Sequence, residues 1–217
     1  KAGVWGPYED YYAANVVGTR NVLDACRAHG IPRLVYTSTP SVTFRGEDEE
    51  GVDESQPYSE RFLCHYAKTK AEAEQMVLAA NSPALATVAL RPHLIWGPGD
   101  NHLVPRVIDR ARKGKLKLVG AGDKLVDSTY YLSNGEPLPM RALLNKILAA
   151  GDLPPVSRRV PPSVAYAVGA LLEGVYGLLG KQEEPIMTRF VARQLSTAHW
   201  FNIGAAQRDF GYTPSVS

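Results

Sequence analysis

The sequence predicts an α/β fold built on a doubly wound parallel sheet, followed by a smaller, mostly helical region. Two observations predict it. Over residues 1–130, segments with apolar residues at helical spacing alternate with short β-branched and aromatic runs, as in strand–helix–strand units. After that point, the apolar segments are mostly of helical length. We therefore expect the C-terminal part of a nucleotide-binding domain over residues 1–130 and a substrate-binding or cap subdomain over 131–217.

The elements of the first region follow in order. A helix is expected over 10–30, where "DYYAANVVGTRNVLDACRAHG" stops at a glycine, and "PRLVYTST" over 32–39 then gives a buried strand. A second helix, rich in alanine, glutamate and lysine, is expected over 66–81, and a second buried strand over 86–92 ends in a proline. Ligands of such sheets bind at the carboxyl ends of the strands.

The remaining elements are mostly helical. A helix over 103–115 leads into the strand-like "LKLVG". Three further helices are expected over 140–151, 163–180 and 186–195. The acidic run "EDEEGVDES", residues 47–55, is expected to be a solvated loop before the second helix.

Composition excludes several classes of function. Lysine and arginine (24) nearly balance aspartate and glutamate (22), so we expect no nucleic-acid partner. The five histidines and two cysteines lack metal-ligand spacing, so we expect no metal site. Cys26 and Cys64, alone in a chain of 217 residues, favour a reducing compartment and a cytoplasmic location. The longest apolar run, 164–180, is interrupted by Glu173 and several glycines, which is unfavourable for crossing a bilayer.

The pair Tyr66 and Lys70 is the first candidate for chemistry. Four residues apart on a helix, the two side chains lie on one face, where an ammonium favours the phenolate form of a tyrosine. A tyrosine titrates near pH ~10, so acid–base work at neutral pH needs such a neighbour. The spacing alone is also that of an ordinary helix surface. The hydroxyls of Thr37, Ser38 and Thr39 at a strand's carboxyl end make the chemical interpretation stronger.

At this point the sequence resembles the extended branch of the short-chain dehydrogenase/reductases. The resemblance rests on "AANVVGTRNVLDACR", "LVYTSTPSV", "YAKTKAEAE", "LRPHLIWGPGD" and "RDFGYTP", in that order along nearly the whole chain. Within the branch it is similar to the 3β-hydroxysteroid dehydrogenase-like group. The segments "KAGVWG", "LIWGPGDNHL" and "SNGEPLPMR" are most similar to the bacterial 2-alkyl-3-oxoalkanoate reductases of long-chain olefin biosynthesis. The resemblance implies a Rossmann-type fold.

The resemblance also implies roles for individual residues. Tyr66 would be the general acid/base, Lys70 would lower its pKa and bind the nicotinamide ribose, and Thr39 would hydrogen-bond the substrate oxygen. The residues expected to bind the cofactor are Ala2, Gly3, Asn15, Ser38, Tyr66, Lys70, Pro92, His93 and Leu94. Those expected to line the substrate site are Ser41, Asp100 and His102. For Asn15 a helix-packing role, and for Pro92 a strand-ending role, stay open.

The implied function is an NADPH-dependent reduction of a long-chain 2-alkyl-3-oxoalkanoate to the 3-hydroxy acid, with NADH left open as the cofactor. A 3β-hydroxysteroid or sterol-4-carboxylate 3-dehydrogenase is the first alternative, and a nucleotide-sugar epimerase or dehydratase the next. A non-catalytic binding module on the same fold is the third class. The apolar segment 163–180 would cover a lipid-like substrate, or contact a membrane surface or partner enzyme. A homodimer also remains open.

Two parts of the family pattern are absent. The 217 residues contain no glycine-rich phosphate loop and no residue that selects NAD or NADP after a second strand. A helix and strand are also missing between Tyr130 and Tyr131, where a parallel crossover needs a dozen or more residues. We therefore expect the chain to be part of a longer polypeptide, with a segment before Lys1 and an insert at 130/131.

Overall fold

The computed structural model describes residues 1–128 and 134–214, and the chain divides into two compact units. The first unit contains residues 1–45, 57–92 and 174–186, and the second contains 46–56, 93–173 and 187–217. Neither unit is continuous in sequence, so the chain passes from one to the other several times. The domain boundary and the insert expected at 130/131 lie outside the described residues.

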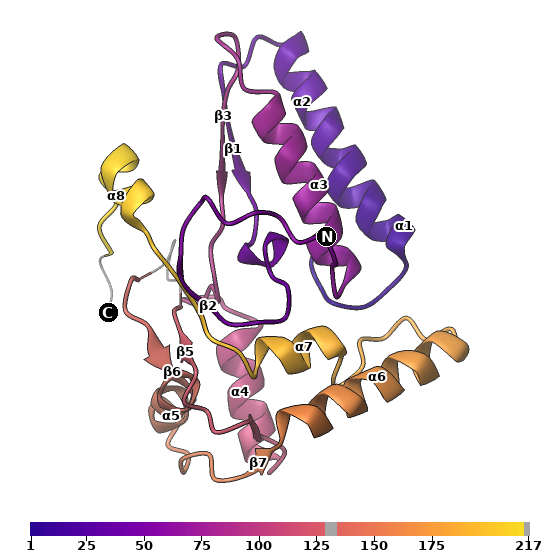
Figure 1. Ribbon diagram of the computed structural model, residues 1–217, viewed down its shortest axis with the longest axis vertical. Coiled ribbons are helices and arrows are strands. Elements are labelled where there is room, and N and C mark those ends of the chain that lie inside the picture. The colour runs from indigo at the N-terminus through magenta and orange to yellow at the C-terminus, as the bar shows by residue number, and fades with distance from the viewer. Residues whose placement is uncertain (129–133, 215–217) are drawn as a thin grey trace. The chain divides into compact units, whose positions relative to one another are not determined.

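The first unit is built on a βαβ arrangement. Strands β1 (Arg33–Thr37) and β3 (Ala86–Leu90) pair in parallel, in a register that runs from Arg33 opposite Ala86 to Thr37 opposite Leu90. Helix α3 (His65–Ala79) lies between them in sequence, and Figure 1 shows α3 and α2 (Gly18–Ala28) side by side along the strands. Leu23, Cys26, Val77 and Leu85 form the buried core of this layer. The Rossmann-type α/β fold expected from the sequence is confirmed.

The first predicted helix is interrupted by a wider turn. Helix α1 (Tyr8–Tyr11) continues through a π-helical segment, η1 (Tyr12–Val17), into α2. The apolar pattern predicts one helix here because a single π turn shifts the helical periodicity only locally. Short π segments are frequent at functional sites, and this one contains Asn15.

The second unit holds a mixed four-stranded sheet in the order β2-β8-β5-β6. Its strands are β2 (Glu49–Val52), β8 (His199–Phe201), β5 (Leu125–Val126) and β6 (Leu138–Pro139). Strand β8 is parallel to both β2 and β5, whereas β6 is antiparallel to β5.

The expectation that residues 47–55 form a solvated loop is wrong for the part that forms β2. The backbone of β2 pairs with β8, and the Glu49 side chain is buried, with Oε2 3.9 Å from His199 Nδ1. Strand pairing with a segment 150 positions away outweighs the polarity of the run, as the bond from Ala198 N to Asp48 Oδ1 also shows.

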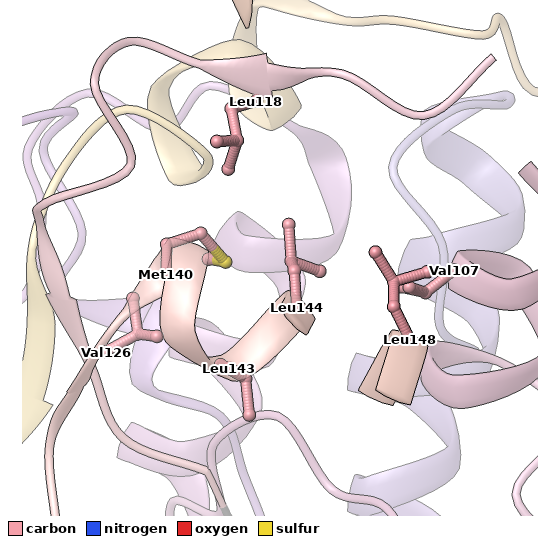
Figure 2. Packing of buried hydrophobic residues seen from close by; sticks show 7 residues of the cluster. All are labelled: Val107, Leu118, Val126, Met140, Leu143, Leu144 and Leu148. Atoms are coloured by element: carbon pink, nitrogen blue, oxygen red, sulfur yellow. The ribbon is translucent and has the colours of Figure 1, made fainter. Parts of the chain in front are cut away.

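A second core packs around α5 (Met140–Ala150) and α4 (Leu103–Arg112) in this unit. Figure 2 shows the apolar side chains of α5 with those of α4, β5 and β4 (Leu118–Val119). The cluster consists of Val107, Leu118, Val126, Met140, Leu143, Leu144 and Leu148. Strand β4 pairs in parallel with β7 (Arg159–Val160).

The other helices expected in the C-terminal half are present as α6 (Pro162–Leu178) and α7 (Arg189–Gln194), and α8 (Gly204–Phe210) follows them. The short strands β6, β7 and β8 that separate these helices were not predicted. Within the described residues, no helix combines the length and apolar content needed to cross a membrane. Among the described residues, Cys26 is buried, Cys64 is partly buried, and neither forms a disulfide.

Candidate active site

The hydroxyl groups at the end of β1 are fixed by the turn that follows the strand. The Ser38 backbone N–H donates to Leu90 O at 2.6 Å, which extends the pairing with β3 by one residue. Thr39 then caps the short 3₁₀ helix η2 (Pro40–Val42) by accepting a hydrogen bond from Ser41 N at 3.3 Å. The Thr39 hydroxyl donates to Ser41 Oγ at 3.2 Å. The two side chains expected to meet the substrate oxygen therefore lie together.

Tyr66 lies in the first turn of α3, which packs against η2. Burial raises the pKa of Tyr66, and a hydrogen bond with Thr39 acts in the opposite direction. We expected Lys70 to lower the pKa of Tyr66. In the structure, burial is the largest influence on this pKa and raises it. At neutral pH the phenol is therefore protonated and can donate a proton.

Lys70 follows Tyr66 by one helical turn and is anchored to β1. Its Nζ donates to Thr37 O at 2.6 Å and lies 4.0 Å from the centre of the Tyr36 ring. Burial lowers the pKa of Lys70 to about 8, while the charge of Glu74 raises it. The ammonium form still predominates at neutral pH, held by a carbonyl oxygen and an aromatic face.

The residues around Lys70 fit the nicotinamide end of a dinucleotide. The Ser38 Oγ is buried and has no hydrogen-bond partner among the described residues, so it has unused capacity for a polar ligand. The Lys70 ammonium has three donors and uses one on Thr37. Ser38 and Lys70 are the side chains that would hold the cofactor, and the phosphate-binding loop is not among the 217 residues.

Asn15 is buried in η1 and joins two elements. Its Nδ2 donates to Thr69 Oγ1 at 3.0 Å, and Thr69 in turn donates to the carbonyl of His65 on α3 at 2.9 Å. This contact holds η1 against the helix that carries Tyr66 and Lys70. The packing role that stayed open for Asn15 is therefore present, and the cofactor role stays a prediction.

The chain near Ala2 and Gly3 has a backbone that favours glycine. Gly3 has φ +113°, and a Cβ there would approach Tyr11 Oη to 3.1 Å. Tyr11 is held by its own bond to Trp5 O at 2.8 Å. Ala2 is exposed. Their expected contact with a cofactor stays a prediction.

The segment after β3 divides between the two units. Pro92, two residues beyond the end of β3, is the last residue of this part of the first unit, while His93 and Leu94 belong to the second unit. His93 Nδ1 lies 2.8 Å from Asp127 Oδ1, and Asp127 Oδ2 accepts from Phe201 N at 3.0 Å, so this buried carboxylate joins the segment to β8. Leu94 has φ 44°, a left-handed conformation that is uncommon for a non-glycine residue and is found preferentially at functional sites.

The expected substrate residues of the second unit lie beside an open depression of about 560 Å³ formed by residues 95–102. Asp100 caps α4, since its Oδ1 accepts from His102 N at 2.7 Å and its Oδ2 from Val104 N at 2.9 Å. These bonds lower the pKa of Asp100 although its partial burial raises it. The carboxylate therefore orders the start of the helix, and its role with His102 in binding substrate stays a prediction.

The sequence analysis missed several groups close to the catalytic candidates. Tyr36, under Lys70, is two residues before Ser38, and strand alternation indicates that both lie on one face of β1. Glu74 follows Lys70 by one further turn of α3 and pairs with Arg91 at 2.6 Å. Glu74 could have been found from its spacing, because Tyr66, Lys70 and Glu74 follow one another at intervals of four residues on the predicted helix. Among the described residues, no cluster of histidine, cysteine or acidic side chains is arranged to hold a metal ion.

Comparison with known proteins gives consistent relatives. Residues 4–147 match the model of the 3-beta hydroxysteroid dehydrogenase/isomerase family. The chain is 55% identical to a 2-alkyl-3-oxoalkanoate reductase of Shewanella oneidensis, covering 100% of this chain and 65% of that protein. It is 52% identical to a protein of the same name from Stenotrophomonas maltophilia, with 100% and 74% covered.

More distant relatives have other activities. The chain is 32% identical to the decarboxylating sterol-4-alpha-carboxylate 3-dehydrogenase of Mus musculus, over 96% of this chain and 66% of that protein. Among solved structures, MoeE5 in complex with UDP-glucuronic acid and NAD superposes with a TM-score of 0.68 at 21% identity, covering 99% of this chain and 71% of that one. At this identity the likeness shows the fold.

Proposed function

Since the chain belongs to the 3-beta hydroxysteroid dehydrogenase/isomerase family, we propose that it is part of a reductase that converts a long-chain 2-alkyl-3-oxoalkanoate to the 2-alkyl-3-hydroxyalkanoate. The observation that carries the proposal is the grouping of Thr39, Ser41 and Tyr66, with Lys70 one turn further along α3. The identity of more than half of the residues to two reductases of that name supports this substrate class.

In the proposed mechanism, residues of this chain bind and protonate the ketone oxygen. A reduced nicotinamide supplies the hydride when bound. Thr39 donates a hydrogen bond to the ketone oxygen as negative charge develops there, and Tyr66 donates the proton that completes the alcohol. The raised pKa of Tyr66 suits this direction, because the phenol is in its acid form at neutral pH. Lys70 holds the ribose and places a positive charge beside the site.

NADPH is the proposed donor, in keeping with the family resemblance. Kinetics with NADPH and NADH at matched concentrations test this choice, and a preference for NADH would overturn it without affecting the proposed reaction.

Isotope transfer tests the reaction itself. The full protein is incubated with NADPH deuterated at the transferred position of C4 and a 2-alkyl-3-oxoalkanoate, and the product is examined by mass spectrometry. We expect one deuterium at C3 of the 3-hydroxy acid and one oxidised cofactor for each product. Turnover of a nucleotide sugar without net cofactor consumption would instead assign the protein to the epimerases.

Helix α6 supports a lipid-like ligand. Its exposed apolar side chains recur at helical spacing, and Leu171 and Leu178 are 66% and 89% exposed. The stripe consists of Val164, Val168, Leu171, Val175 and Leu178. Under the proposal this stripe contacts the alkyl chains of the substrate.

Leu171→Gln tests this contact. We expect a higher KM for long-chain substrates and an unchanged KM for short ones, with Ile31→Gln at an exposed turn as the control. Unchanged kinetics together with weaker binding to phospholipid vesicles would assign the stripe to a membrane surface.

A further inference from the structure

A third ionisable residue continues the row that carries Tyr66 and Lys70. Glu74 lies four residues after Lys70 on α3, so the two side chains are neighbours on successive turns of the helix. The Glu74 side chain is only 1% exposed. A buried carboxylate beside a candidate catalytic lysine can affect the charge of that lysine strongly, because the surrounding dielectric constant is low.

The partners of Glu74 keep its carboxylate in place. Arg91 donates from Nη2 to Oε1 at 2.6 Å and from Nε to both oxygens at 3.1 and 3.2 Å. The Tyr58 hydroxyl also donates to Oε1, at 2.8 Å. Three of these four contacts use Oε1, so Oε2 receives only the longest one.

The charges of this ion pair are screened unequally. The Arg91 side chain is 23% exposed, and its guanidinium lies 5.5 Å from the centre of the Tyr58 ring. Water therefore screens part of the arginine's positive charge, whereas the carboxylate of Glu74 is excluded from water. A group close to the carboxylate therefore experiences more of the negative charge than of the positive one.

Lys70 is one helical turn from Glu74 and experiences its charge. Its Nζ contacts the Thr37 carbonyl and the Tyr36 ring, which are both neutral, and among the described residues no carboxylate lies within ion-pair distance of it. The other ionisable groups near it are the Tyr66 phenol, one turn earlier on α3, and the Tyr36 phenol, whose ring lies under the ammonium. Burial lowers the pKa of Lys70 to about 8, and Glu74 is the charge that opposes this change.

We propose that Glu74 is a positioning residue which keeps the Lys70 ammonium charged across the turn of α3. This inference rests on the proposed function, because a charged Lys70 serves the ribose and Tyr66 in that reaction. The Arg91–Glu74 pair is then more than a structural ion pair: Arg91 and Tyr58 fix the carboxylate, and the carboxylate acts on Lys70.

The titration of Lys70 in the full protein tests the proposal without cofactor or substrate. Competitive labelling of lysines with acetic anhydride over a pH series, read by peptide mass spectrometry, gives the midpoint of each lysine. In Glu74→Gln we expect the Lys70 midpoint to fall by about one pH unit, since a nearby opposite charge shifts a pKa by about that much or more.

The matched control is Glu72→Gln. Glu72 is on the same helix, is partly exposed and lies 3.9 Å from Lys68. The substitution removes one negative charge from α3, as Glu74→Gln does, but from a residue that is partly exposed and lies beside Lys68. The Lys70 midpoint should therefore stay at the wild-type value. An unchanged Lys70 midpoint in Glu74→Gln, or an equal fall in both variants, would overturn the proposal.

Glu74→Gln leaves Arg91 without its partner, which can itself disturb the fold. A double variant distinguishes the loss of the negative charge from such a disturbance. In Glu74→Gln/Arg91→Met we expect a melting temperature closer to wild type than that of the single variant, and a Lys70 midpoint still below wild type. A wild-type midpoint in a stable double variant would show that the single variant acted by distortion, and would overturn the proposal. A failed reductase assay would contradict the proposed function and leave this titration result unaffected.

Discussion

At the scale of residues, burial pushes the two central groups of the site in opposite directions. It raises the pKa of Tyr66 and lowers that of Lys70, because a low-dielectric environment favours the neutral form of each. The Tyr66 phenol is therefore protonated at neutral pH, and the Lys70 ammonium is charged there but loses its proton in mildly alkaline solution. Both properties suit reduction of a ketone near neutral pH.

Replacing the phenol hydroxyl tests the assigned acid. In Tyr66→Phe we expect kcat to fall by about 10²- to 10⁴-fold, the usual contribution of general acid catalysis. The melting temperature should change little, because the ring remains. Steady-state kinetics and circular dichroism check both expectations, and a variant with near-wild-type kcat would remove Tyr66 from this role.

The alkaline limb of the activity profile tests the charge of Lys70. Its pKa in the fold is about 8, so the ammonium is present below that pH and lost above it. We expect kcat/KM for the ketone to decline above about pH 8. The fold should persist there, because a lysine whose pKa is lowered by folding adds stability as pH rises.

Circular dichroism at each pH separates this limb from unfolding, and Lys70→Arg should retain its charge to higher pH. A profile that stays level well past pH 8 would show that the ammonium is not needed.

At the scale of elements, the sequence predicted the helices and strands whose structure follows from their own residues. The helix α3 and the strands β1 and β3 follow from local periodicity, so Tyr66 and Lys70 were placed correctly on α3. Thr39 was expected at the end of the strand but lies two residues beyond β1, where it caps η2. Strand β2 was missed because its partner, β8, lies about 150 positions away. No local pattern shows that an acidic run will be buried by so distant a strand.

Glu74 illustrates the same limit at one residue. Its spacing from Lys70 is visible in the sequence, but its burial and its bond to Arg91 depend on how α3 packs against β3. The π-helical turn that contains Asn15 is likewise invisible to a pattern of apolar residues.

The contact between α6 and α7 gives a prediction at this scale. A Cβ at Gly169 would lie 2.6 Å from the backbone carbon of Thr188, and the Glu173 carboxylate accepts from Arg189 N at 2.7 Å close by. The two helices are therefore held too closely for any side chain at this position. We expect Gly169→Ala to lower the free energy of unfolding by about 1–3 kcal/mol.

Gly174 is the matched control, because among the described residues a Cβ there meets nothing within 4 Å. Gly174→Ala in the same helix should raise stability by up to about 1 kcal/mol. Urea unfolding of both variants measures the difference, and equal stabilities would contradict the packing described for Gly169.

At the scale of the whole molecule, alternation of strands and helices was sufficient to predict the α/β class and, with the motifs, the family. The division into units was beyond the sequence, because each unit is assembled from three separate segments. Contacts between segments far apart in sequence determine such a division. The chain spans 65% of the Shewanella relative, and the proposed activity is that of the whole protein.

The most direct test of the central claim is a comparison of kcat/KM for 2-alkyl-3-oxoalkanoates of increasing chain length with that for a 3β-hydroxysteroid. Each buried methylene contributes about 0.8 kcal/mol, so kcat/KM should rise about four-fold per methylene until the apolar site is filled. We expect this rise, with every long-chain keto acid preferred over the steroid. A response that is flat with chain length, or a clear preference for the steroid, would contradict the proposed reductase.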